Sequence, residues 1–503
     1  MRDPGQKSTG RAPRTSPPTR DLRLPSRAPA APDPGIAAGS GRGTGEPGPV
    51  AVAGGTAYPR YPAPVSRRPH LLYVAWGYPP CRGGGVYRAL ATPNAFAAAG
   101  WDVTVLTVER ETFTRYTGAD ESLEALIDPS ITIVRTPFLW EALETDVRRW
   151  SWLRAHLPRV WRRWIKKRDQ MRDLPEVGYA GWRGDLEAAA ARIHAEKPVD
   201  LTVATANPAT AWMAAWHLHE KGGVPYVLDQ RDGWTLDVFS GDRVHERSSK
   251  IGKWETKLLA DAREVWFVNE PIRAWYAKEY PEVADRMHVV MNGWDPELAP
   301  TAADPVPAQQ PLTYGYLGTI SKMVPLAEFV AGWQKARGDD EVVAGASCSL
   351  RGYLGFYKTP EPKNLALVQA AEESGISFGG PASKTEVADV YAGFDVLLLI
   401  LGAGLYVTSG KVFEYLATGM PIVSVHEPSN AASDVLRGYP LWFPAASLSA
   451  ADIAAALVKA GHAALEADVE TLRAAREFGA SFSRDRQLSP RVEALTASME
   501  VPA

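Results

Sequence analysis

The 503-residue sequence contains only two cysteines, Cys81 and Cys348, and they are far apart and outside any Cys-x-x-Cys arrangement. A disulfide framework and a zinc site are therefore not expected, and a reducing compartment fits best. No apolar run reaches the roughly 18 to 20 residues that a membrane-spanning helix needs. The N-terminus also lacks the apolar stretch of a signal peptide. These absences together predict a cytoplasmic protein.

The sequence also has no large excess of positive or negative charge. The formal net charge is -3, which gives no reason to expect nucleic acid as a partner. Hydrophobic residues make up 45% and charged residues 22%, as in ordinary globular proteins. The length exceeds what one hydrophobic core usually covers, so the chain should form two domains with additional segments.

Composition and pattern divide the chain into four regions. Residues 1–66 are rich in Pro, Gly, Ala, Ser and Arg. We expect a disordered tail there, because this composition cannot bury enough apolar surface to offset the entropy of ordering. We predict an N-terminal Rossmann-like acceptor-side domain over 67–300, a C-terminal Rossmann-like nucleotide-sugar-binding domain over 301–475, and a helical segment over 476–503.

Short apolar runs that are typical of buried strands alternate with helical segments. In the first half they occupy 70–76, 102–107, 131–136, 200–205, 225–229, 264–269 and 287–292. After a Pro- and Ala-rich linker (292–311), further runs occupy 312–318, 347–352, 394–401 and 420–425. Such alternation predicts an α/β fold with parallel sheets covered on both faces. Two tandem Rossmann-like domains that face a central cleft are the simplest interpretation.

Two local signals concern helix limits. Ser383 and Glu386 have the spacing of a capping box, which predicts a helix over 384–392. Pro93 falls inside the helical stretch that follows the first strand. Proline removes a backbone donor, so it should kink this helix or shorten its first part.

Three consecutive glycines, Gly83, Gly84 and Gly85, follow the first predicted strand and precede a helix that begins near Val86. Their backbone N–H groups can approach a phosphate or sugar oxygen, and the helix start adds partial positive charge. A flexible turn is the alternative. A dinucleotide-binding fingerprint is not favoured, because its third glycine would fall at Arg88.

The strongest local signal is TSGKVFEYLATGMPIV (408–423), which directly follows a predicted strand. Thr408 or Ser409 can cap the helix, and Gly410 lets a ligand approach its first turn. Lys411 would then point toward a diphosphate, and Glu414 can accept hydrogen bonds from the two hydroxyls of a ribose. The alternative is a surface ion pair between Lys411 and Glu414, worth only a few tenths of a kcal/mol.

The stretch 410–424 resembles the donor-site helix of family 4 glycosyltransferases, and 70–107 resembles their N-terminal opening. The likeness spans roughly residues 70 to 490. It implies the two-domain GT-B fold, a nucleotide-sugar bound mainly by the C-terminal domain, and transfer with retention of anomeric configuration. Glu414 matches the second glutamate of the family's Glu-(seven residues)-Glu motif. Tyr406 stands where the first, which contacts the donor sugar, is expected, so the sugar stays open.

The run YLGTISK (316–322) resembles the family's strand-glycine loop, in which Gly318 lets the backbone reach the diphosphate. The family often has arginine directly after this glycine, and Thr319 occupies that position here. Lys322 can replace the charge of that arginine, or it can be an ordinary solvated lysine. Both interpretations remain open from the sequence.

Polar residues follow the strand at 225–229. We expect Asp232 or Asp229 to orient the acceptor hydroxyl, and Arg231 to steady developing phosphate charge. The alternative is that Arg231 and Asp232 pair with each other. The histidine that the family often carries near the donor sugar is absent.

No metal and no cofactor are expected. Glycosyltransferases of the other major fold hold a divalent ion with an Asp-x-Asp pair, which does not occur in this sequence. His217 and His219 are two residues apart and would not share a helix face. The charge of the leaving group should then be met by a helix start, backbone N–H groups and a lysine or arginine.

Residues 148–172 contain ten Lys and Arg and a single acidic residue. Apolar residues that include Trp161 and Trp164 recur in this segment at helical spacing, and Pro158 interrupts it. A basic amphipathic helix with tryptophans suits an anionic membrane surface. The alternative is that the apolar stripe packs on the domain core while the arginines face water.

We therefore predict a glycosyltransferase that transfers a sugar from a nucleotide-diphosphate sugar to an acceptor hydroxyl. The acceptor is lipid-linked if 148–172 contacts the inner face of the membrane as a peripheral site, and soluble otherwise. Two alternatives stay open: a GT-B-fold sugar-nucleotide epimerase, and a non-catalytic, membrane-attached sugar-binding protein, which Tyr406 and the missing histidine suggest.

Overall fold

The structure is a computed structural model. It describes residues 67–296, 306–355, 361–382, 386–402 and 404–500. The predicted tail (1–66) lies outside these residues, as do part of the expected linker (297–305) and most of the expected capping box (383–385). We call the lobe built on the first sheet the N-terminal lobe and the one built on the second sheet the C-terminal lobe.

Seven parallel strands form the first sheet, in the order β3-β2-β1-β4-β5-β6-β7. They are β1 (His70–Val74), β2 (Asp102–Val108), β3 (Thr132–Thr136), β4 (Leu201–Thr205), β5 (Tyr226–Gln230), β6 (Glu264–Phe267) and β7 (Met287–Val289). Each expected strand of the first half is present. The predicted parallel sheet is therefore confirmed.

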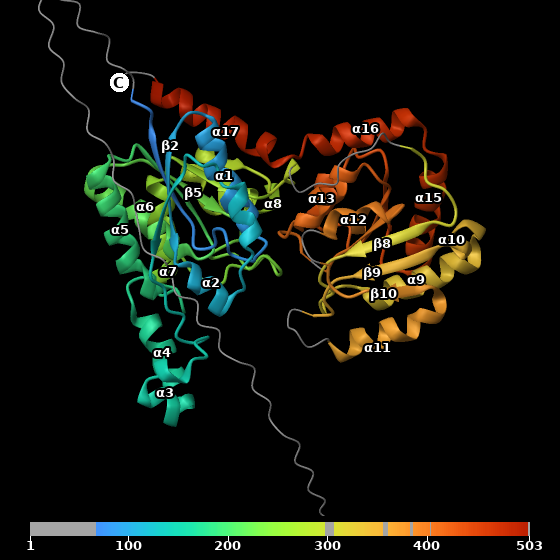
Figure 1. Cartoon of the computed structure of the whole chain (residues 1–503), viewed down its shortest axis with the longest axis horizontal. Helices are drawn as coiled ribbons and strands as arrows, with labels where there is room; N and C mark the ends of the chain where they lie inside the picture. Colours follow the sequence, from blue (N-terminus) through green and yellow to red (C-terminus); the bar gives the residue numbers. More distant parts are fainter. Residues whose placement is uncertain (1–66, 297–305, 356–360, 383–385, 403, 501–503) are drawn as a thin grey trace, which may run out of the picture. The chain divides into compact units, whose positions relative to one another are not determined.

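Helices cover both faces of this sheet (Figure 1). The helices of this lobe are α1 (Val86–Ala98), α2 (Arg110–Tyr116), α3 (Trp152–His156), α4 (Pro158–Met171), α5 (Arg183–Glu196), α6 (Trp212–Gly222), α7 (Lys250–Asp261) and α8 (Glu270–Glu279). Leu72 packs with α5 and α6, whereas the neighbouring Leu71 and Tyr73 pack with α1, because successive side chains of a strand point to opposite faces. Burial of both faces explains the continuous apolar runs in the sequence.

Pro93 lies inside α1, and the helix runs on through it to Ala98. The expectation that Pro93 shortens the first part of the helix is therefore wrong. Short 3-10 turns complete the connections of this lobe: η1 (Glu121–Leu126), η2 (Val147–Arg149), η3 (Ala180–Trp182), η4 (Ala209–Ala211) and η5 (Pro281–Arg286).

Six parallel strands form the second sheet, in the order β10-β9-β8-β11-β12-β13. They are β8 (Thr313–Leu317), β9 (Ser347–Arg351), β10 (Ile376–Phe378), β11 (Val396–Ile400), β12 (Ile422–Val425) and β13 (Trp442–Pro444). The helices are α9 (Leu326–Asp339), α10 (Glu341–Gly345), α11 (Pro362–Ala371), η7 (Glu372–Ser374), α12 (Val387–Ala392), α13 (Gly410–Thr418), α14 (Ala432–Leu436), α15 (Ala450–Glu466) and α16 (Val469–Ala480). Two tandem Rossmann-like units are thus confirmed.

The last helix, α17 (Arg484–Glu500), follows the C-terminal lobe in sequence but packs beside α1 of the N-terminal lobe (Figure 1). Leu488, Val492 and Leu495 recur at helical spacing and join the buried cluster around Trp101. The indole Nε1 of Trp101 donates a hydrogen bond to Thr496 Oγ1 at 2.8 Å. The last described helix therefore completes the core of the N-terminal lobe.

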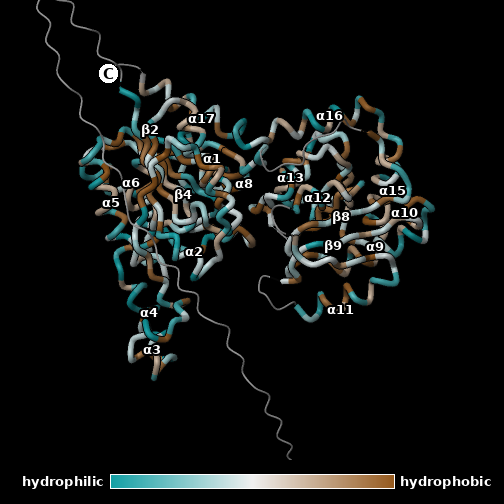
Figure 2. The backbone as a smooth tube through the Cα atoms, viewed as in Figure 1, coloured by the Kyte–Doolittle hydropathy of each residue, from teal (hydrophilic) through white to brown (hydrophobic). Residues whose placement is uncertain are grey.

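Figure 2 shows hydrophobic residues along the strands of both lobes and hydrophilic colours along α4 and other outer helices. Among the described residues, no helix is long and apolar enough to cross a bilayer.

Candidate functional site

One cavity of about 760 Å³ is lined by loops that follow strands of both sheets. Most of the residues predicted to bind donor or acceptor line it: Gly83, Gly84, Gly85, Arg231, Asp232, Gly318, Thr319, Ser409, Gly410, Lys411 and Glu414. These motifs are far apart in the sequence. The fold brings them together because each follows the carboxyl end of a parallel strand.

The strand order explains where the cavity lies. In each sheet the order reverses direction at one point, between β1 and β4 in the first and between β8 and β11 in the second. Ligands of open α/β sheets bind outside the carboxyl ends of the strands at such points. Gly83 to Gly85 follow β1, Gly318 follows β8, and α13 follows β11.

The ammonium group of Lys411 lies in this cavity, and its partners among the described residues are uncharged. Its Nζ donates a hydrogen bond to the Tyr316 hydroxyl at 2.8 Å and lies 4.5 Å from the centre of that ring. The Tyr316 hydroxyl in turn donates to the carbonyl of Thr319 at 3.0 Å. Burial lowers the pKa of Lys411 to about 8, although the charge of Glu414 acts in the opposite direction. A cation held this way is ready to bind an anion.

Gly318 makes room for this lysine. A Cβ atom on residue 318 would lie 1.9 Å from Cε and 2.0 Å from Nζ of Lys411. On the other side, a Cβ on Gly352 would lie 1.9 Å from the Gly318 carbonyl oxygen, so two backbone segments and the lysine side chain meet closely here. The sequence predicted that Gly318 lets the backbone approach a ligand, and the structure adds that it accommodates the cation.

The carboxylate of Glu414 is held by Tyr391, whose hydroxyl donates to Oε2 at 2.8 Å. Tyr391 is buried, and burial followed by the charge of Glu414 raises its pKa, so it stays a hydrogen-bond donor. Lys411 and Glu414 do not pair with each other. The surface ion pair considered from the sequence is therefore wrong.

Helix α13 begins at Gly410, and no side chain caps it. The expected cap by Ser409 is not formed. No atom lies within 4 Å of a Cβ placed on Gly410, so the space beside the first turn is open. The N–H groups of an uncapped helix start require other acceptors, and a phosphate oxygen is one that can fill this role.

On the N-terminal side, Arg231 lies against Gly85. A Cβ on residue 85 would be 1.4 Å from Nη1 of Arg231, so only glycine leaves room for the guanidinium group. Arg231 Nε donates to the Ala206 carbonyl at 2.6 Å, and Asp232 accepts a hydrogen bond from Asn207 Nδ2 at 2.6 Å. Arg231 and Asp232 thus have separate partners rather than pairing with each other.

Asp229 occupies a different environment from the one expected. It is completely buried, does not line the cavity, and accepts hydrogen bonds from Arg88 Nε at 2.9 Å and Nη2 at 2.7 Å. Arg88 also donates to the carbonyl of Val290 at 2.7 Å. The structure therefore corrects the expected role of Asp229 in orienting an acceptor, because its oxygens are used in an internal ion pair.

Lys322 is exposed and does not line the cavity. The side chains of Ile320 and Ser321 are buried, and the chain turns away from the site after Thr319. The cation next to Gly318 is instead Lys411. It lies on α13 of the same lobe, almost one hundred residues later in the sequence. Of the two interpretations left open by the sequence, the structure therefore supports the one in which Lys322 is an ordinary solvated lysine.

A buried carboxylate that the sequence did not reveal supports the turn carrying Arg231. The hydroxyl of Tyr276 accepts hydrogen bonds from Gln230 Nε2 at 2.6 Å and from the Trp234 amide at 3.0 Å, and donates to Glu255 at 2.7 Å. The Tyr280 hydroxyl donates to the other oxygen of Glu255 at 2.6 Å. Burial raises the pKa of Glu255. No spacing signal identifies this network, because its members come from separate segments.

Tyr406, which occupies the position of the family's first glutamate, packs against the hydrophobic cluster of the N-terminal lobe and also lines the cavity. Asn269 Nδ2 donates to the Tyr406 carbonyl at 2.9 Å and to Thr408 Oγ1 at 3.1 Å. The loop before α13 is thus held by Asn269, which caps α8 of the N-terminal lobe. At this position Tyr406 presents an aromatic ring to the cavity, where the family's glutamate would present a carboxylate.

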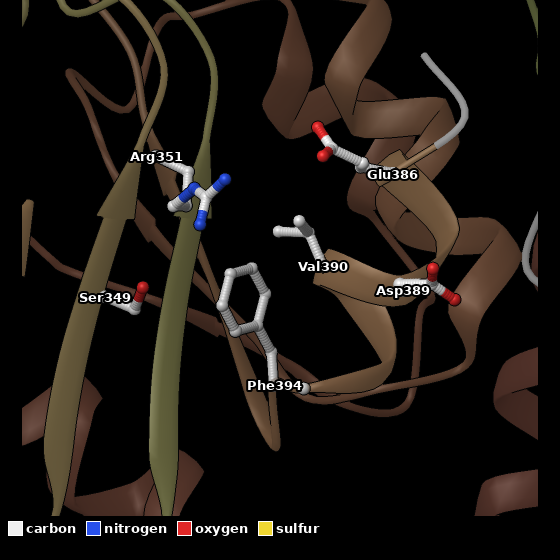
Figure 3. Close-up of a pocket in the computed structure, with 7 residues that line it drawn as sticks. Ser349, Arg351, Glu386, Asp389, Val390 and Phe394 are labelled. Atoms are coloured by element: carbon white, nitrogen blue, oxygen red, sulfur yellow. The ribbon is translucent and has the colours of Figure 1, made fainter. Parts of the chain in front are cut away.

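A smaller and more open pocket of about 390 Å³ lies on the other side of α12 (Figure 3). Arg351 of β9 points into it, opposite Glu386, Val390 and Phe394. None of the predicted site residues lines this pocket. Among the described residues, no three His, Cys, Asp or Glu side chains come together as a metal site would require.

No known protein-family model matches the sequence, and no curated protein matches it either. Solved structures do match. A glycosyltransferase from Rickettsia africae has 12% identity and a TM-score of 0.57, covering 86% of this chain and 100% of its own. Sucrose-phosphate synthase from Thermosynechococcus elongatus has 15% identity and a TM-score of 0.56, with coverage of 86% and 100%. Anabaena HepE in complex with UDP has 12% identity and a TM-score of 0.56, with coverage of 85% and 100%. The chain therefore has the GT-B fold.

Proposed function

We propose that this protein is a glycosyltransferase that moves a sugar from a nucleotide-diphosphate sugar to an acceptor hydroxyl. One observation carries the proposal: Lys411 and Glu414 lie at the start of one helix inside a large cavity, and neither neutralises the other. Arg231 and Asp232 line the same cavity from the other lobe. The fold agrees, because similar solved structures include HepE in complex with UDP and with UDP-glucose.

In the proposed reaction the bond between the anomeric carbon and the diphosphate oxygen breaks, and its electron pair leaves with the nucleoside diphosphate. The acceptor oxygen forms a new bond to the anomeric carbon and passes its proton to the Asp232 carboxylate. Lys411 and the N–H groups at the start of α13 stabilise the charge on the leaving diphosphate. Arg231 adds positive charge from the opposite side. The Asp232 carboxylate accepts a hydrogen bond from the acceptor hydroxyl.

We propose that Glu414 binds the two ribose hydroxyls of the donor. Replacing Glu414 by alanine should weaken nucleoside diphosphate binding about tenfold or more, since hydrogen bonds to a charged group contribute about 1.5 to 3 kcal/mol. Isothermal calorimetry with UDP and GDP measures this. Glu477→Ala, an exposed position on α16, is the matched control and should leave affinity unchanged. Equal affinity of Glu414→Ala and the wild-type protein would overturn the assignment.

We further propose that transfer needs no metal and retains the anomeric configuration. The metal proposal is supported by Lys411, which supplies positive charge at the diphosphate, and the stereochemical one by the family likeness of 410–424. Activity should survive dialysis against EDTA, and the anomeric configuration of the product can be read by NMR. Loss of activity that added Mg²⁺ restores would contradict metal independence.

An epimerase that uses the same donor is the alternative enzyme, and a sugar-binding protein is the alternative without catalysis. A transferase releases nucleoside diphosphate in proportion to added acceptor. An epimerase changes the sugar without acceptor, and a binding protein shows affinity without turnover. The cation and carboxylate at α13 favour catalysis with a diphosphate leaving group.

We also propose a lipid-linked acceptor and a cytoplasmic location at the inner face of the membrane. Both cysteines, Cys81 and Cys348, are buried and unpaired, which suits a reducing compartment. A panel of polyprenyl-phosphate-linked and free sugars as acceptors tests this. Transfer to free sugars alone would show that the acceptor is soluble.

A further inference from the structure

The helix α4 and the preceding α3 form an outer extension of the N-terminal lobe (Figure 1). Pro158 occupies the first turn of α4, where its missing N–H is not needed, so it begins this helix rather than breaking it. Trp161 and Ile165, one turn apart, are buried. Part of the apolar stripe seen in the sequence is thus used for packing.

The rest of that stripe is exposed. Val160, Trp164 and Met171 recur at i, i+4 and i+11 on α4 and are 51%, 50% and 68% exposed. At 100° per residue these three side chains share one strip of the helix surface, beside the buried strip. On the adjoining α3, Trp152 is 68% exposed. Large exposed aromatic residues in such a cluster require an apolar partner.

Positive charge borders the exposed strip. The cations of α4 that face solvent are Arg159, Arg162, Arg163, Lys166 and Lys167. By helical geometry Arg163 and Lys167 lie on the side of the strip away from the core. Among the described residues, these five side chains have no hydrogen-bond or ion-pair partner.

The acidic residues nearby do not neutralise these cations. Glu141 and Asp169 both pair with Arg168 at 2.9 Å, and Asp146 pairs with Arg148 at 2.9 Å. Glu144 is buried and accepts a hydrogen bond from Tyr116. The whole chain carries a net charge of -3, so this positive surface is a local feature and not a consequence of overall composition.

We propose that this surface of α3 and α4 docks onto an anionic lipid membrane, with Trp164 and Val160 at the level of the headgroups. Anionic headgroups match the unpaired cations, and indole rings suit the boundary between water and acyl chains. Long Arg and Lys side chains beside the apolar strip can reach the phosphates. This attachment goes beyond sugar transfer, because it depends on neither donor nor acceptor.

The test is co-sedimentation of the full chain with vesicles, without donor or acceptor. The protein should bind vesicles of phosphatidylcholine mixed with phosphatidylglycerol, bind pure phosphatidylcholine much more weakly, and dissociate as salt is raised. Each basic residue at such a surface contributes about fivefold to binding. The variant R163E/K167E should therefore weaken binding by about 25-fold or more.

The matched control is K278E/K459E, which reverses two exposed lysines outside this surface and should bind as the wild type does. Trp insertion has its own readout: brominated lipids should quench the protein's fluorescence, and W152F/W164F should remove that quenching. Thermal melting verifies that R163E/K167E is folded. The proposal is overturned if the wild-type protein ignores anionic vesicles, which would point to an acidic protein partner instead, or if R163E/K167E binds them equally well.

Discussion

The ammonium group of Lys411 contacts the hydroxyl and the ring of Tyr316 and forms no ion pair with a carboxylate. Below a pH of about 8 the side chain is charged and partly desolvated, which is unfavourable until an anion arrives. A bound diphosphate stabilises the charged form and raises the pKa of Lys411 again. Binding of a nucleoside diphosphate is thereby linked to the protonation of one residue.

This linkage predicts a pH dependence. Below a pH of about 7 Lys411 is charged before binding, so this residue contributes no pH dependence to UDP affinity there. As the pH rises through about 8, binding must take up a proton, so affinity should fall by up to about tenfold per pH unit. Calorimetry in buffers of different ionisation enthalpy measures both affinity and proton uptake.

The control for this pH dependence is Lys411→Arg, whose guanidinium stays charged over the whole range. It should bind with an affinity that does not fall above a pH of about 8. If the pH profile of the wild-type protein and that of Lys411→Arg coincide, Lys411 is not the titrating group.

Gly318 is predicted to be intolerant of even one methyl group. Gly318→Ala would place Cβ 1.9 Å from Lys411 Cε and force the lysine away from Tyr316. Affinity for nucleoside diphosphates should fall by about tenfold or more, with a smaller change for nucleosides, because the lysine serves the phosphates. Calorimetry with both ligand classes distinguishes the two.

Gly345→Ala is the comparison variant, since no atom lies within 4 Å of its added Cβ. It should leave both affinities unchanged. A Gly318→Ala protein that binds UDP normally would mean that Lys411 has another position from which it serves the phosphates.

At the scale of elements, two kinds of support hold the site. α13 is fixed by its own buried residues, including Val412, Phe413 and Leu416. The turn after β5 is anchored by Leu236, which is buried in the core of the N-terminal lobe, and it also has a polar support. It is held by the hydroxyl of Tyr276, which links it to Glu255 on α7.

We predict that Tyr276→Phe slows sugar transfer without changing the affinity for the donor nucleotide. The change removes the acceptor for Gln230 Nε2 and for the Trp234 amide, so Arg231 and Asp232 lose their fixed position. We expect kcat to fall about tenfold or more while UDP affinity is unchanged, and stability to fall by about 1–3 kcal/mol. Steady-state kinetics and calorimetry measure these quantities.

Tyr280→Phe separates positioning from stability. The Tyr280 hydroxyl also donates to Glu255 but has no hydrogen bond to the turn. Tyr280→Phe should therefore lower the stability about as much as Tyr276→Phe does, while kcat stays nearly unchanged. If both variants reduce kcat in proportion to stability, the network is structural and does not position Arg231.

At the scale of the whole molecule, the last described helix, α17, packs in the N-terminal lobe although it follows the C-terminal lobe in sequence. Leu488 and Leu495 of α17 are buried beside α1. Replacing either by alanine should lower the free energy of unfolding by about 2–5 kcal/mol, because the change removes buried methyl groups and leaves a cavity. Denaturant titration with probes in each lobe measures this.

The loss should affect the N-terminal lobe, although both leucines are C-terminal in sequence. Glu493→Ala, exposed on the same helix, should change stability by less than about 0.5 kcal/mol. A variant Leu488→Ala that destabilises only the C-terminal lobe would contradict the packing of α17 on α1.

The sequence by itself determined both halves of the fold and most of their strands, but not the short edge strands β10 and β13. Strands such as 70–76 and 394–401 were predictable because a strand buried on both faces must be apolar throughout. The glycine loops and the motif at 408–423 were predictable because helix starts after parallel strands need small residues wherever a ligand approaches closely. The placement of Lys411 and Glu414 in one cavity followed from that rule.

Only the tertiary structure decided which polar residues are free to act. Asp229 and Asp232 are three positions apart and equally polar in the sequence. Arg88, from another segment, forms a buried ion pair with Asp229, so the Asp229 carboxylate is not available to a ligand. The partners of Lys411 and of Tyr276 likewise come from segments far away in the chain. Such pairings depend on distances across the fold, which periodicity and local spacing do not encode.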